Sequence, residues 1–388
     1  MGDTTAIKLV FGGDFAPVRG YESLIDLKGG AIFGDARTVF KSSDFVICNL
    51  EAPLCLHGSP ISKVGPHLRA QPNTLKALVE AGVQAVCLAN NHIFDYGAEG
   101  LAETVALLDE HGIAHAGAGL SRPEAEAPIR LNIGGKLISI FSFAEREFNL
   151  SETEEAGAAN LDPLRVGPLL ASERHEVDAV IVCFHGGNEY FAYPRPGLRR
   201  MCHYLVEMGA DAVIGHHPHV PGPYETFKGK PIVYSLGNLV FDHAKPPSGW
   251  SEGYFAEVSL LFNSDNLDNV VTNIVPYKQS SSSGGVKLMD GAEKETFIER
   301  ILEMRNELEN SPGKWINRWN EFVDQKRSQA IINLVSPVRF RGLRRVLDLK
   351  AMRKILSPES RRLHRLNLLR CDSHRELLTA VFERRFDR

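Results

Sequence analysis

The stretch VQAVCLANNHIFDYGAEGLAETVALLDEHG (83–112) contains the pattern that decides the fold. Its first part (83–90) is predominantly apolar, as expected of a strand that is covered on both faces. Residues 98–112 have apolar side chains at helical spacing and close on a glycine, a common helix end. Asn91 and His92 stand between the two. The stretch therefore predicts a strand–helix unit with polar side chains at the carboxyl end of its strand.

The same alternation continues over residues 6–277. Further buried strands are predicted at 7–13, 44–50, 136–143, 178–186, 211–217 and 231–238, with helices at 72–82 and 198–209. Residues 254–262 and 269–277 have the pattern of two late, antiparallel strands. Strands that alternate with helices favour βαβ crossovers. We therefore expect a layered α/β fold, with a largely parallel or mixed sheet and helices on both faces.

Length and composition limit the class of protein. The chain has 388 residues, which suggests two domains at roughly 150 residues each. Its 43% hydrophobic and 24% charged residues exclude wholesale disorder. We find no apolar stretch long enough for a membrane span and no pattern of a secretory signal, so we expect a cytoplasmic location, either free or at a membrane surface. The six scattered cysteines are expected to be reduced and buried.

The charge distribution suggests a division of the chain. Residues 326–388 hold 17 Lys and Arg against 6 Asp and Glu, whereas the remainder holds 27 against 42. We expect a catalytic domain at 1–279, a Ser/Gly linker at 280–285 and a helical, basic region at 286–388. Those helices could pack on the acidic body, or bind an anionic membrane surface, an acidic polymer or capsule machinery. Nucleic acid is an unlikely partner, because no recognition motif accompanies the charge.

Chemically active side chains follow five of the predicted strands. These are Asp14, Glu51, Asn91 with His92, His185, and His217 with His219. In an open α/β sheet, ligands bind at the carboxyl ends of the strands, so these groups should converge. Imidazoles, an amide oxygen and carboxylates are typical ligands of a transition metal.

Each of these residues also has an ordinary structural interpretation. Asp14 could cap a helix, Glu51 could be a solvated loop charge, and His185 could be a hydrogen-bonded interior residue. The His217-Pro-His219 sequence is harder to dismiss, because it would place two imidazoles on one face of an extended chain. Ordinary roles at all five strand ends are improbable together, which favours a metal site.

The order of several motifs resembles a known family. GGD, NLEAPL, LANNHIFDYG, FHGGNEY, GADAVIGHHPHV and YSLGNLVFD follow one another over about residues 7–245. This order is similar to that of the capsule biosynthesis (poly-γ-glutamate synthesis) CapA family, which looks like a branch of the calcineurin-like metallophosphoesterases. The resemblance implies a layered metallophosphoesterase-like fold, with β-sheets flanked by helices, and one or two divalent ions of Mn, Zn, Fe or Mg.

The resemblance also implies roles for single residues. Its metal ligands would be Asp14, Glu51, Asn91, His185, His217 and His219. His92 would be the acid/base group, Asp95 could orient it, and Arg69 could hold an anionic group. Glu189, Tyr190, Asn238 and Asp242 are softer candidates for the lining of the pocket, and His216 for support of the ligands. The sequence departs from the superfamily in two places, because Ala16 replaces a histidine and Glu51 replaces a bridging aspartate.

These features favour a metal-dependent, hydrolase-like enzyme linked to capsule or poly-γ-glutamate biosynthesis or processing. Its substrate would be an anionic polymer, a peptide or a phosphoester, attacked by metal-activated water. Two alternatives remain open. The same site could act as a peptide epimerase that abstracts a Cα proton, or the chain could be a non-catalytic component of a capsule assembly machine.

Overall fold

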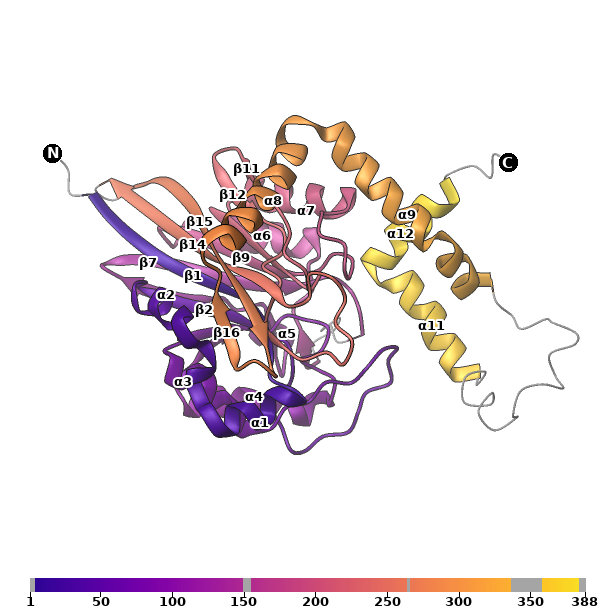
Figure 1. The fold of residues 1–388 in the computed structure, drawn as a ribbon, viewed down its shortest axis with the longest axis horizontal. Coiled ribbons are helices and arrows are strands. Elements are labelled where there is room, and N and C mark those ends of the chain that lie inside the picture. Colours follow the sequence, from indigo (N-terminus) through magenta and orange to yellow (C-terminus); the bar gives the residue numbers. More distant parts are fainter. Residues whose placement is uncertain (1–3, 149–154, 264–265, 336–357, 384–388) are drawn as a thin grey trace, which may run out of the picture.

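The computed structural model describes residues 4–148, 155–263, 266–335 and 358–383 (Figure 1). Its strands are β1 (Thr4–Ala16), β2 (Phe45–Leu50), β3 (Ala85–Cys87), β4 (Ala114–Ala116), β5 (Ala118–Gly119), β6 (Ile129–Ile133), β7 (Lys136–Ala144), β8 (Gly157–Ala158), β9 (Ala179–His185), β10 (Ala212–His216), β11 (Tyr224–Phe227), β12 (Lys230–Val233), β13 (Asn238–Phe241), β14 (Glu252–Asn263), β15 (Asn266–Ser280) and β16 (Gly285–Leu288). Its α-helices are α1 (Gly20–Lys28), α2 (Arg37–Lys41), α3 (Lys76–Ala81), α4 (Gly97–Glu110), α5 (Arg122–Glu126), α6 (Pro163–Glu173), α7 (Pro196–Glu207), α8 (Gly291–Asn310), α9 (Pro312–Val335), α11 (Pro358–Arg370) and α12 (Asp372–Glu383), and two 3₁₀ helices are η1 (Gly29–Ala36) and η2 (Pro72–Leu75).

The strands form two large sheets. One has the order β16-β15-β14-β1-β2-β3-β4, with β13 also paired to β1, and the other has the order β11-β12-β10-β9-β7-β6. Neighbouring strands from β1 to β4 are parallel, as are those in the run β12-β10-β9-β7. The expected α/β architecture with parallel crossovers is therefore confirmed, and the antiparallel β14–β15 pair is confirmed with it.

The two sheets pack face to face, with helices on the outside. Leu9 and Phe11 of β1 share an inner core with Ile140 of β7 and Ile181 of β9, whereas Val10 faces the opposite way, into an outer core. Helices α1, α3 and α4 cover one outer face, and α6 and α7 cover the other (Figure 1). These helices thus lie on the outer faces of two sheets, which differs from the expected single sheet with helices on both faces. A strand covered by a second sheet has the same apolar pattern as one covered by helices.

The Ser/Gly run expected to be an interdomain linker is instead a hairpin turn. Strands β15 and β16 pair antiparallel, with Ser280 opposite Gly285 and a four-residue turn between them. Gly285 has a φ of 113°, and a Cβ there would overlap the Ile32 carbonyl oxygen, so this position requires glycine. Beyond the hairpin, α8 packs Phe297 and Ile301 into the inner core. The linker prediction is therefore wrong: β16 belongs to the large sheet and α8 packs against the core between the sheets.

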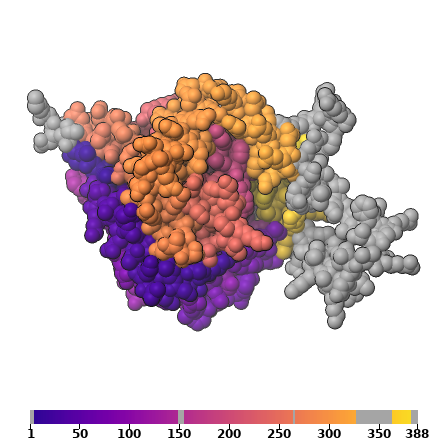
Figure 2. Space-filling model, in the orientation of Figure 1, coloured from indigo at the N-terminus to yellow at the C-terminus, as the bar shows by residue number. Residues whose placement is uncertain are grey.

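The expected C-terminal helical extension is present in α8, α9, α11 and α12. The last three form an apolar cluster with a loop of the body, made of Phe191, Trp319, Phe322, Val323, Leu368, Leu377, Leu378 and Val381. In the space-filling view these orange and yellow helices lie along the upper and right-hand side of the body (Figure 2). Residues 336–357 and 384–388, which are part of the basic region predicted to be helical, lie outside the described residues. Across the described ranges, no helix is both long and apolar enough to cross a membrane.

Candidate metal centre

The carboxyl ends of the parallel strands bring polar side chains to one place. Asp14 of β1 lies in register with Asn49 of β2, and His185 of β9 lies in register with His216 of β10. The backbone before Asp14 must be glycine, because a Cβ at Gly13 would overlap the Gly237 carbonyl oxygen. This close approach explains the second glycine of the GGD motif.

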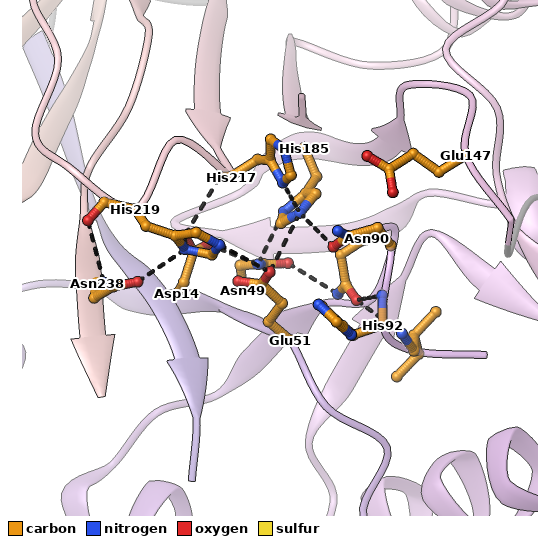
Figure 3. Close-up of polar contacts among 12 residues, drawn as sticks. Asp14, Asn49, Glu51, Asn90, His92, Glu147, His185, His217, His219 and Asn238 are labelled. Carbon is orange, nitrogen blue, oxygen red and sulfur yellow. Dashed lines mark hydrogen bonds and ion pairs between the residues drawn. The ribbon is translucent and has the colours of Figure 1, made fainter. Parts of the chain in front are cut away.

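Five of the six predicted metal ligands meet in two overlapping groups. Glu51, His185 and His217 form one group, and Asp14, Glu51 and His219 form the other, with the potential ligand atoms of each group within 4.8 Å of one another. All five side chains are buried, and Glu51 belongs to both groups (Figure 3). The sixth predicted ligand is adjacent, because the Oδ1 atom of Asn91 lies 3.0 Å from Nε2 of His185.

The Glu51 carboxylate is buried in this cluster without hydrogen bonds to offset the loss of water. Neither oxygen has a hydrogen-bond partner among the described residues, and Oε1 lies 3.5 Å from His185 Nε2 and 3.7 Å from His219 Nε2. Burial, and then the nearby Asp14, raise its pKa well above the ordinary value. A buried carboxylate without a donor is unfavourable, and a divalent cation between these nitrogen and oxygen atoms would satisfy it. The residues present therefore fit a metal ion.

Burial favours the neutral, metal-binding form of two imidazoles, those of His185 and His217. Burial, followed by neighbouring imidazoles, lowers the pKa of His185 well below its ordinary value. The same two causes lower the pKa of His217 to about 4. Neutral imidazoles offer a lone pair to a cation, so both residues are ready to bind one near neutral pH.

Asn238 fixes the orientation of His219. Its amide nitrogen donates to the carbonyl oxygens of His219 and Trp250, each at 3.1 Å, so its Oδ1 atom must accept from Nδ1 of His219, 3.0 Å away. The proton is thereby assigned to Nδ1 and the lone pair to Nε2, which is directed toward Glu51. Burial would lower the pKa of His219, but the hydrogen bond and charge of Asp14, together with Glu189 and Asn238, outweigh it and raise that pKa.

Two further asparagines form a chain of hydrogen bonds that ends on the Asp14 carboxylate. Asn49 donates to Oδ1 of Asp14 at 2.8 Å, and Asn90 donates to Oδ1 of Asn49 at 3.2 Å (Figure 3). The Oδ1 atom of Asn90 accepts from the backbone nitrogens of His92 and Ile93 and so shapes the turn after β3. Sequence analysis assigned no role to either asparagine, although both stand at predicted strand ends.

The backbone of the His-Pro-His sequence differs from the expected extended conformation. His217 has a φ of 101° and His219 a φ of 60°, both in the left-handed region that non-glycine residues rarely adopt. The two imidazoles converge because of this turn, and their centroids lie 5.6 Å apart. His216 is directed elsewhere, with Nε2 3.1 Å from the Gly12 carbonyl oxygen. Backbone strain of about 1–3 kcal/mol per residue is often found at functional sites.

His92 lies beside this cluster in a contact with Asp95, as the sequence analysis expected. Its Nδ1 atom is 2.7 Å from Oδ2 of Asp95. Lys63, which sequence analysis missed, forms a buried ion pair with Asp95, and its Nζ lies 3.2 Å from His92 Nδ1 and 3.3 Å from the Asn91 carbonyl oxygen. Burial and then the Lys63 charge lower the pKa of His92. Lys63 stands in an irregular segment without a motif, so no sequence signal marked it.

Two predicted residues lie away from the cluster. Arg69 is exposed, with its guanidinium 4.6 Å from the centroid of the Tyr96 ring, and the structure does not bring it to the centre. The neighbouring Leu68 is the buried residue, and its backbone nitrogen donates to Asp95. Asp242 accepts from the backbone nitrogen of Gly20 at the start of α1.

A cavity of about 370 Å³ adjoins the centre. Its lining includes Asn91, His92 and His217, together with the expected Glu189 and Tyr190. Glu147, which follows β7, also lines it, and its carboxylate points toward the cluster (Figure 3). Burial, and then the nearby Glu189, raise the pKa of Glu147 to about 7.

Comparison with known proteins now identifies the family. The sequence model of the bacterial capsule synthesis protein PGA_cap matches residues 8–243. The chain belongs to this family. The matched segment contains every predicted catalytic and metal-ligating residue, which confirms the resemblance seen in the motifs, whereas helices α8, α9, α11 and α12 lie outside it.

Named relatives agree with this membership. The chain is 31% identical over 229 residues to the capsule biosynthesis protein CapA of Bacillus anthracis, covering 57% of this chain and 54% of that protein. It is 30% identical over 246 residues to the PGA biosynthesis protein CapA of Bacillus subtilis, covering 62% and 63%. A probable polyglutamine synthesis accessory protein of Mycobacterium tuberculosis is 29% identical, with 59% and 64% covered.

The chain thus spans between about half and two thirds of these relatives' own lengths. Among solved structures, a hypothetical protein from Thermus thermophilus is 20% identical at a TM-score of 0.43, covering 70% of this chain and 99% of that one.

Proposed function

We propose that this chain is a metal-dependent hydrolase that cleaves an ester or amide bond during the synthesis or processing of a capsule or poly-γ-glutamate polymer. The observation that supports it most is the buried Glu51 carboxylate, which has no hydrogen-bond partner within the described structure and belongs to both potential ligand groups. The names of the relatives support the substrate class.

One or two ions of Mn, Zn, Fe or Mg would be held by Asp14, Glu51, Asn91, His185, His217 and His219. When bound, the metal would supply a Lewis acid and a nucleophile derived from water near neutral pH. The chain's own contribution is to hold these ligands in place. Asn238 fixes the protonation of His219, and Asn49 holds the Asp14 carboxylate.

His92 would exchange the proton of the leaving group. It lines the cavity, and Asp95 engages its Nδ1 atom, which leaves Nε2 as the atom that can donate or accept a proton. Lys63 stabilises the position of Asp95 beside His92, because it contacts both Asp95 and the Asn91 carbonyl oxygen. A positioned acid/base residue of this kind typically contributes about 10²–10⁴ to the rate.

The test begins with elemental analysis of the purified chain, followed by assays on phosphoesters and γ-glutamyl peptides with Mn²⁺ supplied. We expect His92→Ala to lower kcat by about 10²–10⁴ while leaving the metal content unchanged. A metal-free protein that also fails to bind Mn²⁺ would contradict the proposal. Exchange of a Cα hydrogen in deuterated water without cleavage would contradict the hydrolase and support the epimerase alternative.

The partner of the basic C-terminal region remains a separate prediction. The charge of residues 326–388 left two alternatives open, packing on the acidic body and binding to an anionic membrane surface or capsule machinery; residues 336–357 and 384–388 of this region lie outside the described residues. The described helices α11 and α12 instead contribute to the cavity beside the metal centre.

A further inference from the structure

The cavity beside the candidate metal centre has two walls that come from different parts of the chain. His92 and His217 lie on the body side, whereas Asn367, Leu368 and His374 come from α11 and α12. The PGA_cap match ends at residue 243, so this second wall lies outside the family segment. A cavity of about 370 Å³ is at the small end of ligand pockets and suits a small molecule or a chain end.

Helix α12 is attached to the body by specific contacts. The Arg195 side chain is 3% exposed and forms ion pairs with Glu145 of the body and, at 2.9 Å, with Glu376 of α12. Phe191 stacks on Phe322 of α9 with ring centroids 4.5 Å apart. A buried arginine with two carboxylate partners is strongly destabilised when one partner is removed. The helical wall is therefore an integral part of the folded chain.

Two residues of this lining have buried amide oxygens that lack partners. Asn188 of the body is 6% exposed and Asn367 of α11 is 9% exposed, and within the described residues neither Oδ1 atom has a hydrogen-bond partner. Their amide nitrogens are already used, by the Ser373 carbonyl oxygen at 3.4 Å and by His374 Nδ1 at 3.3 Å. Each residue therefore still needs a hydrogen-bond donor, which a ligand can provide.

The charges on the lining favour the same kind of ligand. Glu147 and Glu189 both border the cavity, and Figure 3 shows the Glu147 carboxylate directed toward the metal centre. Two lysines also line the cavity, and each has a partner there. Lys63 is paired with Asp95, and the ammonium of Lys326 lies 5.5 Å from the centroid of an aromatic ring on α9. The cavity thus offers acceptors and negative charge to whatever enters it.

We propose that this cavity is a subsite for the free amino group of a peptide substrate. The ammonium would be held by Glu147 and Glu189, with Asn188 and Asn367 as additional acceptors, while the peptide carbonyl faces the metal centre. The assignment rests on the proposed function for the nature of the substrate. It makes α11 and α12 the elements that select a chain end over the interior of a polymer.

Isothermal titration calorimetry on the full chain tests this subsite. The probes are γ-glutamylglutamate, which has a free amino group, and its Nα-acetyl derivative, each measured with and without Mn²⁺. We expect the free amine to bind at least about tenfold more tightly, since acetylation removes the charge and two donors. Equal affinity for the two probes, or no binding of the free amine, would overturn the assignment.

Variants separate ligand recognition from a structural role. Asn367→Leu and Glu189→Gln should each reduce the preference for the free amine to below about threefold. Asn367→Leu removes a buried acceptor that has no partner in the described structure, and with it the amide contact to His374 Nδ1, so its temperature of unfolding is measured beside its affinities. A variant that stays folded but has lost the preference supports ligand recognition. Asn317→Leu, on an exposed position of α9, is the matched control and should keep the full preference. Variants at Asn367 and Glu189 that retain the wild-type preference would contradict the subsite.

The outcomes distinguish this inference from the proposed function. A preference for the free amine in a chain that holds no metal and cleaves nothing would support the subsite and refute the hydrolase. Hydrolysis by a metal-loaded chain that binds both probes equally would support the hydrolase and refute the subsite.

Discussion

Two buried glutamates of this protein have opposite surroundings. Glu225 on β11 is contacted by Arg199 at 2.5 Å, by His203 at 2.8 Å and by the hydroxyl of Tyr234. Burial alone would raise the pKa of Glu225, but these hydrogen bonds outweigh it and lower the pKa to about 2. Glu51 is also buried, has no donor among the described residues, and has a raised pKa.

The difference shows how a structural carboxylate can be told from a ligand. Around Glu225 the chain supplies its own positive charge and hydrogen bonds, so nothing further is needed. Around Glu51 it supplies imidazoles that are themselves lone-pair donors, together with the second carboxylate of Asp14. A cation bound between these groups would supply the positive charge that the chain itself does not place there.

The largest change in Mn²⁺ affinity is expected from Glu51→Gln. Removing the carboxylate shared by both ligand groups should weaken Mn²⁺ binding by at least about 1,000-fold, or about 4 kcal/mol. The metal-free protein should be no less stable, because the native carboxylate makes no hydrogen bond within the described structure. Metal binding by calorimetry and unfolding in denaturant measure the two effects.

Glu225→Gln should show the reverse pattern. It breaks a buried ion pair and is expected to destabilise the fold by about 3 kcal/mol, while Mn²⁺ affinity stays within about twofold of wild type. If Glu225→Gln abolished metal binding, or if Glu51→Gln destabilised the metal-free fold to the same extent, the distinction between the two carboxylates would be lost.

The stability of the protein should depend on pH through Glu225. Its folded pKa of about 2 lies below the ordinary value of 4.5, so the stability it contributes is present above pH 4.5 and is lost as the pH falls toward 2. Between pH 5 and 3 this amounts to about 2 kcal/mol. Denaturant unfolding of wild type and Glu225→Gln across this range measures it. Parallel pH curves for the two proteins would contradict this prediction.

Among the residues of the centre, the smallest change in Mn²⁺ affinity is expected from replacing Asn238, which supports a ligand instead of binding the metal itself. Asn238→Ala removes the acceptor that fixes His219, and it should weaken Mn²⁺ binding by roughly tenfold without abolishing it. Competition with a chelator of known affinity measures the change. An unchanged affinity would show that His219 needs no such support or is not a ligand.

The sequence alone predicts much of the site, because polar groups after parallel strands must share one sheet edge. That rule predicted that Asp14, Glu51, His185, His217 and His219 lie together, and they do. Their meeting also depends on the packing of two sheets, because Asp14 and Glu51 belong to one sheet and the histidines to the other. The rule could not show that β1 and β9 lie in different sheets, because buried strands have the same apolar pattern under helices and under a second sheet.

The residues that sequence analysis missed lie on irregular or distant segments. Lys63 reaches His92 from a loop without periodicity, and Asn367 reaches the same cavity from a helix beyond the family segment. Arg69 was placed by resemblance, but it faces away because its neighbour Leu68 is the buried residue. These contacts depend on tertiary packing, which the local sequence pattern does not determine.

Anomalous X-ray diffraction from crystals of the chain grown with Mn²⁺ tests the central claim most directly. We predict an anomalous peak at coordination distance, about 2.0–2.2 Å, from an oxygen of Glu51 and from at least one imidazole of His185, His217 or His219. Crystals that show no such peak at saturating Mn²⁺, with Glu51 hydrogen-bonded to protein or water instead, would contradict it.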